Sequence, residues 1–174
     1  AATSESGTVG TYGGIEIPPV TIFMDGFLRG VVQYNADNDA DVTVLGWDGS
    51  TGLFTGDFED QDKGRSTTQS LIDEGADVIL PVAGPVGLGT IAAAQATNGV
   101  KVVWVDSDGC ESTDGCDVIL TSILKRVDNA VFDAIEDNSA TAEVLRIKAA
   151  LMDCIRAYIA EHGLTQQQAA DRMR

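Results

Sequence analysis

Short apolar runs alternate with helical patterns along the first 136 residues, and this alternation constrains the fold more than any other feature. The expected strands are residues 8–12, 41–47, 76–84, 101–106 and 117–122. The expected helices are residues 18–34, 62–74, 88–97 and 123–136. The run ADVILPVAG lacks polar alternation, which is typical of a strand buried on both faces. Strands and helices in this order predict an α/β fold, a Rossmann-like parallel sheet with flanking helices.

The charge balance changes near Asn138. Residues 1–138 hold 6 Lys and Arg against 23 Asp and Glu, a net charge of -17, whereas residues 139–174 hold 5 against 4, a net charge of +1. We therefore expect two parts, an α/β lobe over residues 1–138 and a helical tail over residues 139–174.

The tail has the pattern of one long helix that Gly163 ends, followed by the start of a second helix. Apolar side chains recur on one helical face from Val144 to Ile159, and Thr165 with Gln168 has capping-box spacing. This apolar face would either cover the lobe or pair with a second copy of the chain. The tail thus predicts a homo-oligomer formed through its C-terminal helix as one alternative.

Composition and residue inventory argue against several classes of function. The net charge of -16 repels phosphate backbones and anionic membranes, so we expect a soluble chain that does not bind nucleic acid. There is no Ser-His-Asp set, and the single histidine, His162, lies in the tail with Cys154. We therefore expect no catalytic residue, no metal and no cofactor. Residues 1–10 lack the pattern of a signal peptide, so we expect any export signal or anchor to lie outside this sequence.

Cys110 and Cys116 bracket the polar segment ESTDG, which we expect to form a hairpin-like acidic loop. The pair could close a small disulfide in an oxidising compartment. Two free surface thiols are the alternative.

Ligands of open parallel sheets bind beyond the carboxyl ends of the strands, so residues that follow strands are the first candidates. Asp106 ends an apolar strand, and Lys125, expected about one turn into the next helix, would converge on the same sheet edge. Gly84 opens the segment GPVGLGT, for which a tight strand-to-helix turn is favoured over a phosphate cradle. Each of these residues alone is more often structural than functional.

Two aromatic residues, Phe54 and Phe58, lie in the long Gly- and Asp-rich connection of residues 49–64. Either ring could offer a flat apolar face on which a base stacks. Folding back onto the core is an equally good interpretation.

Five separated segments resemble the basic membrane protein (BMP) family of substrate-binding lipoproteins of ABC importers, related to purine nucleoside receptors. They are VGTYGGIEIPPVTIFMDGFLRGV, DFEDQDKG, GADVILPVAGPVGLGTIAAA, VVWVDSDG and ILTSILKRVDNAVFDAI, which together cover about residues 7–138. The resemblance implies one lobe of a type I periplasmic-binding fold that closes on a nucleoside. It also implies an ABC permease as partner and an extracytoplasmic, membrane-anchored location in the parent family.

The resemblance also assigns roles to individual residues. Phe58 would stack on the base, Gly84 would offer a backbone contact, and Asp106 with Lys125 would hold the ribose hydroxyls. The family's portions before Ala1 and after Asn138 are missing from this sequence, so we expect an open cleft with weak or no affinity.

The tail resembles the opening helices of a Cro/repressor or antitoxin-type helix-turn-helix, most specifically in GLTQQQAA. The recognition helix of that class would lie after Arg174, so the tail should not read bases. Two resemblances that meet near Asn138 indicate a fused, recombined or engineered chain. The expected function is a non-catalytic nucleoside-binding lobe; the alternative is a helical interaction scaffold, or a truncated DNA-binding regulator, without ligand binding.

Overall fold

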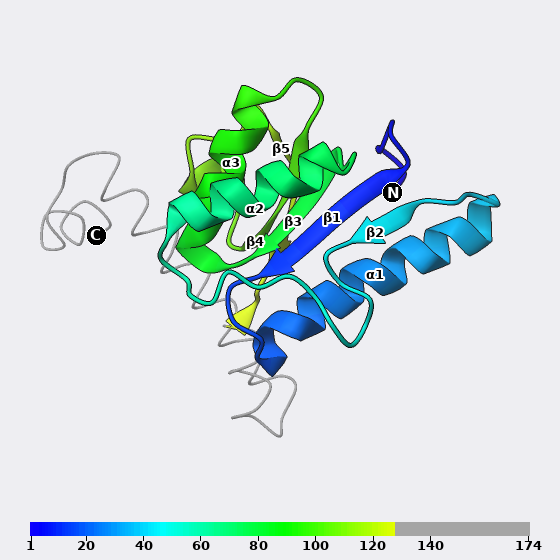
Figure 1. The fold of residues 1–174 in the computed structure, drawn as a ribbon, viewed down its shortest axis with the longest axis horizontal. Helices are drawn as coiled ribbons and strands as arrows, with labels where there is room; N and C mark the ends of the chain where they lie inside the picture. The colour runs from blue at the N-terminus through cyan, green and yellow to red at the C-terminus, as the bar shows by residue number, and fades with distance from the viewer. Residues whose placement is uncertain (128–174) are drawn as a thin grey trace, which may run out of the picture. The chain divides into compact units, whose positions relative to one another are not determined.

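A computed structural model describes residues 1–127, of which residues 1–125 form one compact unit built on a five-stranded parallel sheet (Figure 1). The strand order is β2-β1-β3-β4-β5. The strands are β1 (Thr8–Gly13), β2 (Thr43–Leu45), β3 (Val78–Val82), β4 (Lys101–Asp106) and β5 (Ile119–Leu124). This architecture confirms the α/β class predicted from the sequence. The helical tail expected over residues 139–174 lies outside the described residues.

Helices cover both faces of the sheet. They are α1 (Pro18–Asn38), α2 (Gln61–Asp73), the 3-10 turn η1 (Gly84–Val86), α3 (Gly87–Ala96) and the short α4 (Gly109–Ser112). Helix α1 begins with two prolines, whose fixed φ and missing N–H suit a first helical turn. Helix α2 begins after Asp60, whose carboxylate accepts the backbone N–H groups of Asp62 and Lys63. Among the described residues, no helix is both long and apolar enough to cross a bilayer.

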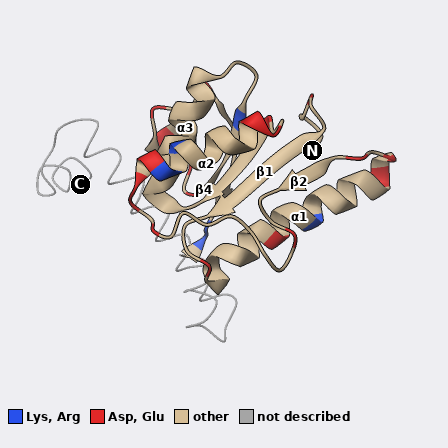
Figure 2. Cartoon of the chain, in the orientation of Figure 1, with Lys and Arg blue, Asp and Glu red and all other residues tan. Residues whose placement is uncertain are grey.

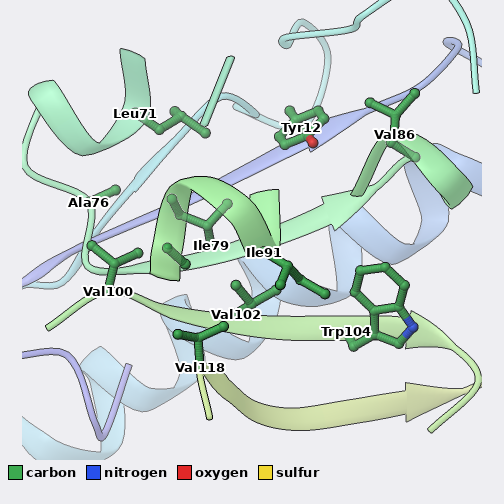
Figure 3. Close-up of a cluster of buried hydrophobic side chains, with 12 residues drawn as sticks. Tyr12, Leu71, Ala76, Ile79, Val86, Ile91, Val100, Val102, Trp104 and Val118 are labelled. Carbon is green, nitrogen blue, oxygen red and sulfur yellow. The ribbon is translucent and has the colours of Figure 1, made fainter. Parts of the chain in front are cut away.

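The two faces of the sheet carry separate hydrophobic cores, because successive residues of a strand point in opposite directions. In β3, Val78, Leu80 and Val82 pack with α1, whereas Ile79 packs with side chains from α2 and α3. Figure 3 shows the second of these clusters, in which Leu71 and Ile91 meet the sheet residues Ile79 and Val102. Strand β3 is therefore buried on both faces, as its unbroken apolar sequence predicts.

Three buried hydroxyl groups join β1 to the helices above it. The hydroxyl of Tyr12 is 2.7 Å from that of Thr90, which is 2.8 Å from that of Thr68, and all three side chains are fully buried. Burial raises the pKa of Tyr12, so the phenol stays neutral. Polar groups removed from water in this way require each other as partners.

We expect Thr90→Val to lower the free energy of unfolding by about 1–3 kcal/mol, because the change leaves two buried hydroxyls without their shared partner. Thr67→Val is the matched control, because Thr67 is next to Thr68 in α2 but is less buried. This change should alter the free energy of unfolding by less than about 0.5 kcal/mol. Urea unfolding followed by circular dichroism measures both. Equal stability of the two variants would contradict this account of the hydroxyl cluster.

The structure corrects two expectations at the end of the sheet. Strands β4 and β5 are parallel, so the connection of residues 107–118 is a crossover that contains α4 and not a hairpin-like loop. Strand β5 also continues to Leu124, where Ile123 and Leu124 pair with Val105 and Asp106. Residues 123 and 124 therefore belong to β5 and not to the helix expected over residues 123–136, and the part of that expected helix from residue 128 on lies outside the described residues. Pairing with β4 outweighed the helical pattern, because strand formation depends on its neighbours more than on local sequence.

The crossover between β4 and β5 is closed by a disulfide. Cys110 and Cys116 are bonded, with their Cα atoms 4.5 Å apart, and both residues are exposed. Disulfides form and persist in oxidising environments and are rare in cytosolic proteins.

We expect one reactive thiol, that of Cys154, when the unreduced protein is denatured and titrated with a thiol reagent. After reduction the count should rise to three. A count of three without reduction would show that Cys110 and Cys116 are free.

Candidate functional site

The ends of four neighbouring strands meet at one edge of the sheet. Gly14, Ala83, Ser107 and Lys125 follow β1, β3, β4 and β5 directly, and parallel strands have their carboxyl ends on the same side. The direction of chain progression reverses between β1 and β3, since β2 lies on one side of β1 and the later strands lie on the other. Ligands of open α/β sheets bind at such a switch point.

A pocket of about 300 Å³ opens at this edge, and all four residues proposed from the sequence line it. The four residues come from two loops, the start of η1 and one strand end: Phe58, Lys125, Gly84 and Asp106. The remaining lining residues are apolar and belong mostly to the start of α1 and the end of β3: Ile17, Pro19, Val20, Phe23, Val82 and Pro85. The pocket thus combines an apolar wall with one carboxylate and one ammonium group.

Asp106 and Lys125 face each other across the β4 and β5 ends. Oδ1 of Asp106 is 3.7 Å from Nζ of Lys125, and the backbone N–H of Lys125 donates to the carbonyl of Asp106 at 3.0 Å. About half of each side chain is exposed, 51% and 47% respectively. Exposed pairs of this kind add little to stability. Both groups therefore keep hydrogen-bonding capacity for a ligand.

Asp106 has an unusual backbone conformation. Its φ is 71°, in the left-handed region that side chains other than glycine rarely adopt. Aspartate tolerates this region better than most residues, yet the conformation still costs about 1–2 kcal/mol. Strain of this kind gathers at functional sites, where it aims a side chain that an extended backbone would direct elsewhere.

The two loop aromatics have different roles. Phe54 forms an isolated bridge with Gly13 and packs edge-to-face on Trp47, with ring centroids 6.1 Å apart. Phe58 is half-buried, touches the α1-side core and lines the pocket. Of the two interpretations open in the sequence, packing onto the core therefore describes Phe54, whereas Phe58 also faces the site.

The loop that carries Phe58 and the turn that carries Gly84 are held together by close backbone contacts between α2 and α3. A side chain at Gly64 would overlap the carbonyl of Val86, and one at Gly89 would overlap the carbonyl of Gln61. Only glycine permits this approach. The contact places the start of α2 against η1, so two walls of the pocket are joined through the backbone.

A second pocket, of about 270 Å³, shares Gly84, Pro85 and Asp106 with the first and extends over Trp104 toward Ser107 and Ser112. A third, of about 430 Å³, runs along the β2 edge past Trp47 and Asp48 and contains none of the four proposed site residues. The carboxylate of Asp48 is already occupied there, because backbone and hydroxyl groups of Thr51 and Ser50 donate to it and lower its pKa.

Sequence reasoning missed the apolar wall contributed by Ile17, Pro19 and Phe23 at the start of α1. These residues could have been recognised as candidates from the sequence, because they follow Gly13 and Gly14 at the carboxyl end of β1. They were missed because Phe23 has helical spacing with the core positions of α1, and this spacing favours a purely structural role.

An ion pair stands directly beside Phe58. The Asp57 carboxylate accepts Nζ of Lys63 at 2.6 Å and the backbone N–H groups of Glu59 and Asp60 at 3.0 and 2.8 Å. The bond from Lys63 and those from the backbone lower the pKa of Asp57 to about 2, and the same pair raises the pKa of Lys63.

We expect the Asp57 carboxyl to titrate near pH 2 in a carbon-detected NMR titration. In Lys63→Met its pKa should rise toward the ordinary value of 3.8. Because the pKa is depressed in the folded state, the pair stabilises the loop above the unfolded pKa and loses this effect as pH falls toward 2. An Asp57 pKa that is the same in both proteins would contradict the ion pair.

Comparison with known proteins identifies the class to which this fold and site belong. Residues 1–148 match the family model described as ABC transporter substrate-binding protein PnrA-like. The chain belongs to this family, Bmp.

Individual relatives agree with this assignment. The CD4+ T-cell-stimulating antigen of Listeria monocytogenes is 33% identical over 144 residues, covering 75% of this chain and 38% of the relative. The ABC transporter nucleoside-binding protein BmpA of Lactococcus lactis is 28% identical over 147 residues, covering 76% and 39%. A solved ABC transporter solute-binding protein from Aeropyrum pernix has a TM-score of 0.58 and 31% identity, covering 75% and 34%. The chain thus spans less than two fifths of the length of these relatives.

Proposed function

We propose that the chain contributes one wall of the solute site of an ABC importer's binding protein, and that the solute is a nucleoside bound without bond chemistry. The observation that carries this proposal is the strand-end pocket, which places two aromatic rings, those of Phe23 and Phe58, with one carboxylate and one ammonium group around a single space. The Lactococcus lactis relative, which is described as nucleoside-binding, supports the same ligand class.

Each group in the pocket suits one part of a nucleoside. The Phe58 ring offers an apolar face to the base. The Asp106 carboxylate accepts hydrogen bonds only, so it suits the two neighbouring hydroxyls of ribose, and Lys125 donates to the oxygen atoms of the same sugar. Gly84 brings backbone to the pocket wall between these two regions.

The start of α1 favours an uncharged solute over a phosphorylated one. Helix N-termini bind phosphate through free backbone N–H groups. Here Pro18 and Pro19 have no N–H group, and the N–H of Val20 already donates to the carbonyl of Ile17 at 2.9 Å. The helix end that forms the pocket wall therefore lacks donors for phosphate at its first three positions.

An extracytoplasmic location and an ABC permease as partner follow from the same proposal. Substrate-binding proteins deliver their solutes to the permease outside the cytoplasmic membrane, and the Cys110–Cys116 disulfide suits that oxidising environment.

We expect weak but saturable heat at one site when the full chain is titrated with adenosine, guanosine, inosine or uridine, and none with AMP. Asp106→Asn should weaken binding at least about tenfold, because the amide replaces one acceptor by a donor while still tolerating the left-handed backbone. Asp114→Asn, an exposed residue of the adjacent crossover, is the control for lost charge and should bind as the wild type.

Unchanged affinity in Asp106→Asn, with an unchanged unfolding midpoint, would remove Asp106 from the site. Absence of heat with all four nucleosides would overturn the proposed ligand class for this chain. Tighter binding of AMP than of adenosine would overturn the argument from the α1 terminus.

A further inference from the structure

We propose that Gly14 and the Asp57–Lys63 ion pair are positioning residues for Phe58, which they hold in the one orientation that receives a base. This inference rests on the proposed function, since Phe58 is the ring assigned to the base. Neither Gly14 nor Asp57 nor Lys63 lines the pocket, so their effect on binding is indirect.

Gly14 supplies the surface on which the Phe58 ring lies. A Cβ atom at Gly14 would overlap Cδ1 and Cε1 of that ring, and it would come within 2.8 Å of the carbonyl oxygen of Asp57. The ring therefore packs directly on the backbone that leaves β1. Any larger residue at position 14 would push Phe58 away from this surface.

Backbone hydrogen bonds fasten the preceding loop to the same strand end. The N–H of Thr55 donates to the carbonyl of Gly13 at 3.0 Å, and the N–H of Gly56 donates to that of Gly14 at 2.8 Å. The Thr55 hydroxyl donates to the carbonyl of Asp57 at 3.0 Å. The segment thus runs along β1 up to the residue before Phe58.

The ion pair fastens the other side of Phe58. Asp57 lies immediately before the ring, and its carboxylate binds the two backbone N–H groups that follow Phe58 as well as Nζ of Lys63, in the first turn of α2. Asp60 then caps α2. Phe58 is consequently enclosed by a turn whose ends are fixed to β1 and to α2.

Fixing the ring in advance matters because base stacking depends on the plane of the aromatic group. An aromatic ring already held in its bound orientation loses less conformational entropy when the base arrives. A residue that supports the ring but does not touch the ligand can therefore change the affinity, by changing the orientation of the ring.

The test measures adenosine affinity of the full chain by calorimetry in three variants. Gly14→Ala should weaken binding about tenfold, because the added methyl group displaces the ring, and stacking on an aromatic side chain is worth about this factor or more. Lys63→Met should weaken it about two- to threefold, because exposed ion pairs are individually weak. Lys101→Met is the matched control: its Nζ bonds the carbonyl of Asp117 at the opposite end of β4, and it should bind as the wild type.

A double-mutant cycle separates positioning from general damage to the fold. In a Phe58→Leu background, Gly14→Ala and Lys63→Met should have little further effect on affinity, since the ring that they orient is gone. Losses of the same size in both backgrounds would overturn the proposal, as would wild-type affinity in both single variants.

A ligand-free measurement keeps this inference distinguishable from the proposed function. With 4-fluorophenylalanine incorporated, the Phe58 resonance is the one that disappears in Phe58→Leu. Gly14→Ala and Lys63→Met should shift that resonance, and Lys101→Met should not. If it stays in place in the first two variants, the positioning role is wrong whatever the protein binds. If it shifts but Phe58→Leu binds nucleosides as the wild type does, the ring is held as proposed but does not receive the base, and that overturns its assigned role.

Discussion

Parallel pairing between β1 and β3 is the constraint on which the rest of the structure depends. The two strands are in register from Val9 opposite Val78 to Gly13 opposite Val82, so they end together at the same edge. Strand β2 pairs with one edge of β1, and β3 pairs with the other edge. The connection from β1 to β2 and the connections that follow β2 therefore run in opposite directions across the sheet. Because such connections are right-handed, α1 lies on one face and α2 with α3 on the other (Figure 1). The same reversal opens the crevice between the β1 and β3 ends, where Phe58 and Gly84 meet. One pairing therefore produces both the two cores and the strand-end pocket.

Stability and binding capacity are located in different parts of this lobe. The buried strands and the Tyr12, Thr68 and Thr90 hydroxyls hold the sheet to its helices, and no buried side-chain nitrogen or oxygen of the described residues lacks a partner. The strand-end edge contributes little: the Asp106–Lys125 pair is half exposed, and Asp106 carries a strained backbone. A residue in that conformation persists only where its surroundings determine it. The β4–β5 ladder does so here, since it pairs Asp106 with Leu124 and fixes the carbonyl of Asp106 on the N–H of Lys125.

The sequence predicts the sheet and the meeting of four candidate site residues at one edge, because both depend on the order of apolar runs. Asp106 could be placed because it ends such a run, and Gly84 because it follows one. The position of Lys125 was wrong in detail, since ILTSIL reads equally as the end of a strand or the start of a helix, and only the neighbouring β4 decides between them. Phe54 and Phe58 could not be distinguished, because the sequence does not show what each ring packs against. Phe54 contacts Trp47 of the same connection, whereas Phe58 lies on Gly14, which is distant in sequence and has no side chain to indicate the contact. The supporting role proposed for Lys63 was not predicted either, since an Asp and a Lys six residues apart in an acidic segment usually belong to a solvated surface.

Charge placement gives the strand-end pocket a character unlike that of the molecule around it. Acidic residues greatly outnumber basic ones, and Figure 2 shows them on loops and helices while the strands stay largely uncharged. Within this acidic field, Lys125 in the pocket wall and Lys63 in the first turn of α2 each face an aspartate. The Asp106–Lys125 ion pair leaves the pocket with no net charge of its own. The negative electrostatic field of the surrounding acidic residues opposes the approach of anions. The solute proposed above, with an aromatic base and several hydroxyl groups, suits such a pocket, because it would contact the Phe58 ring and the ion pair without being repelled by the acidic surface.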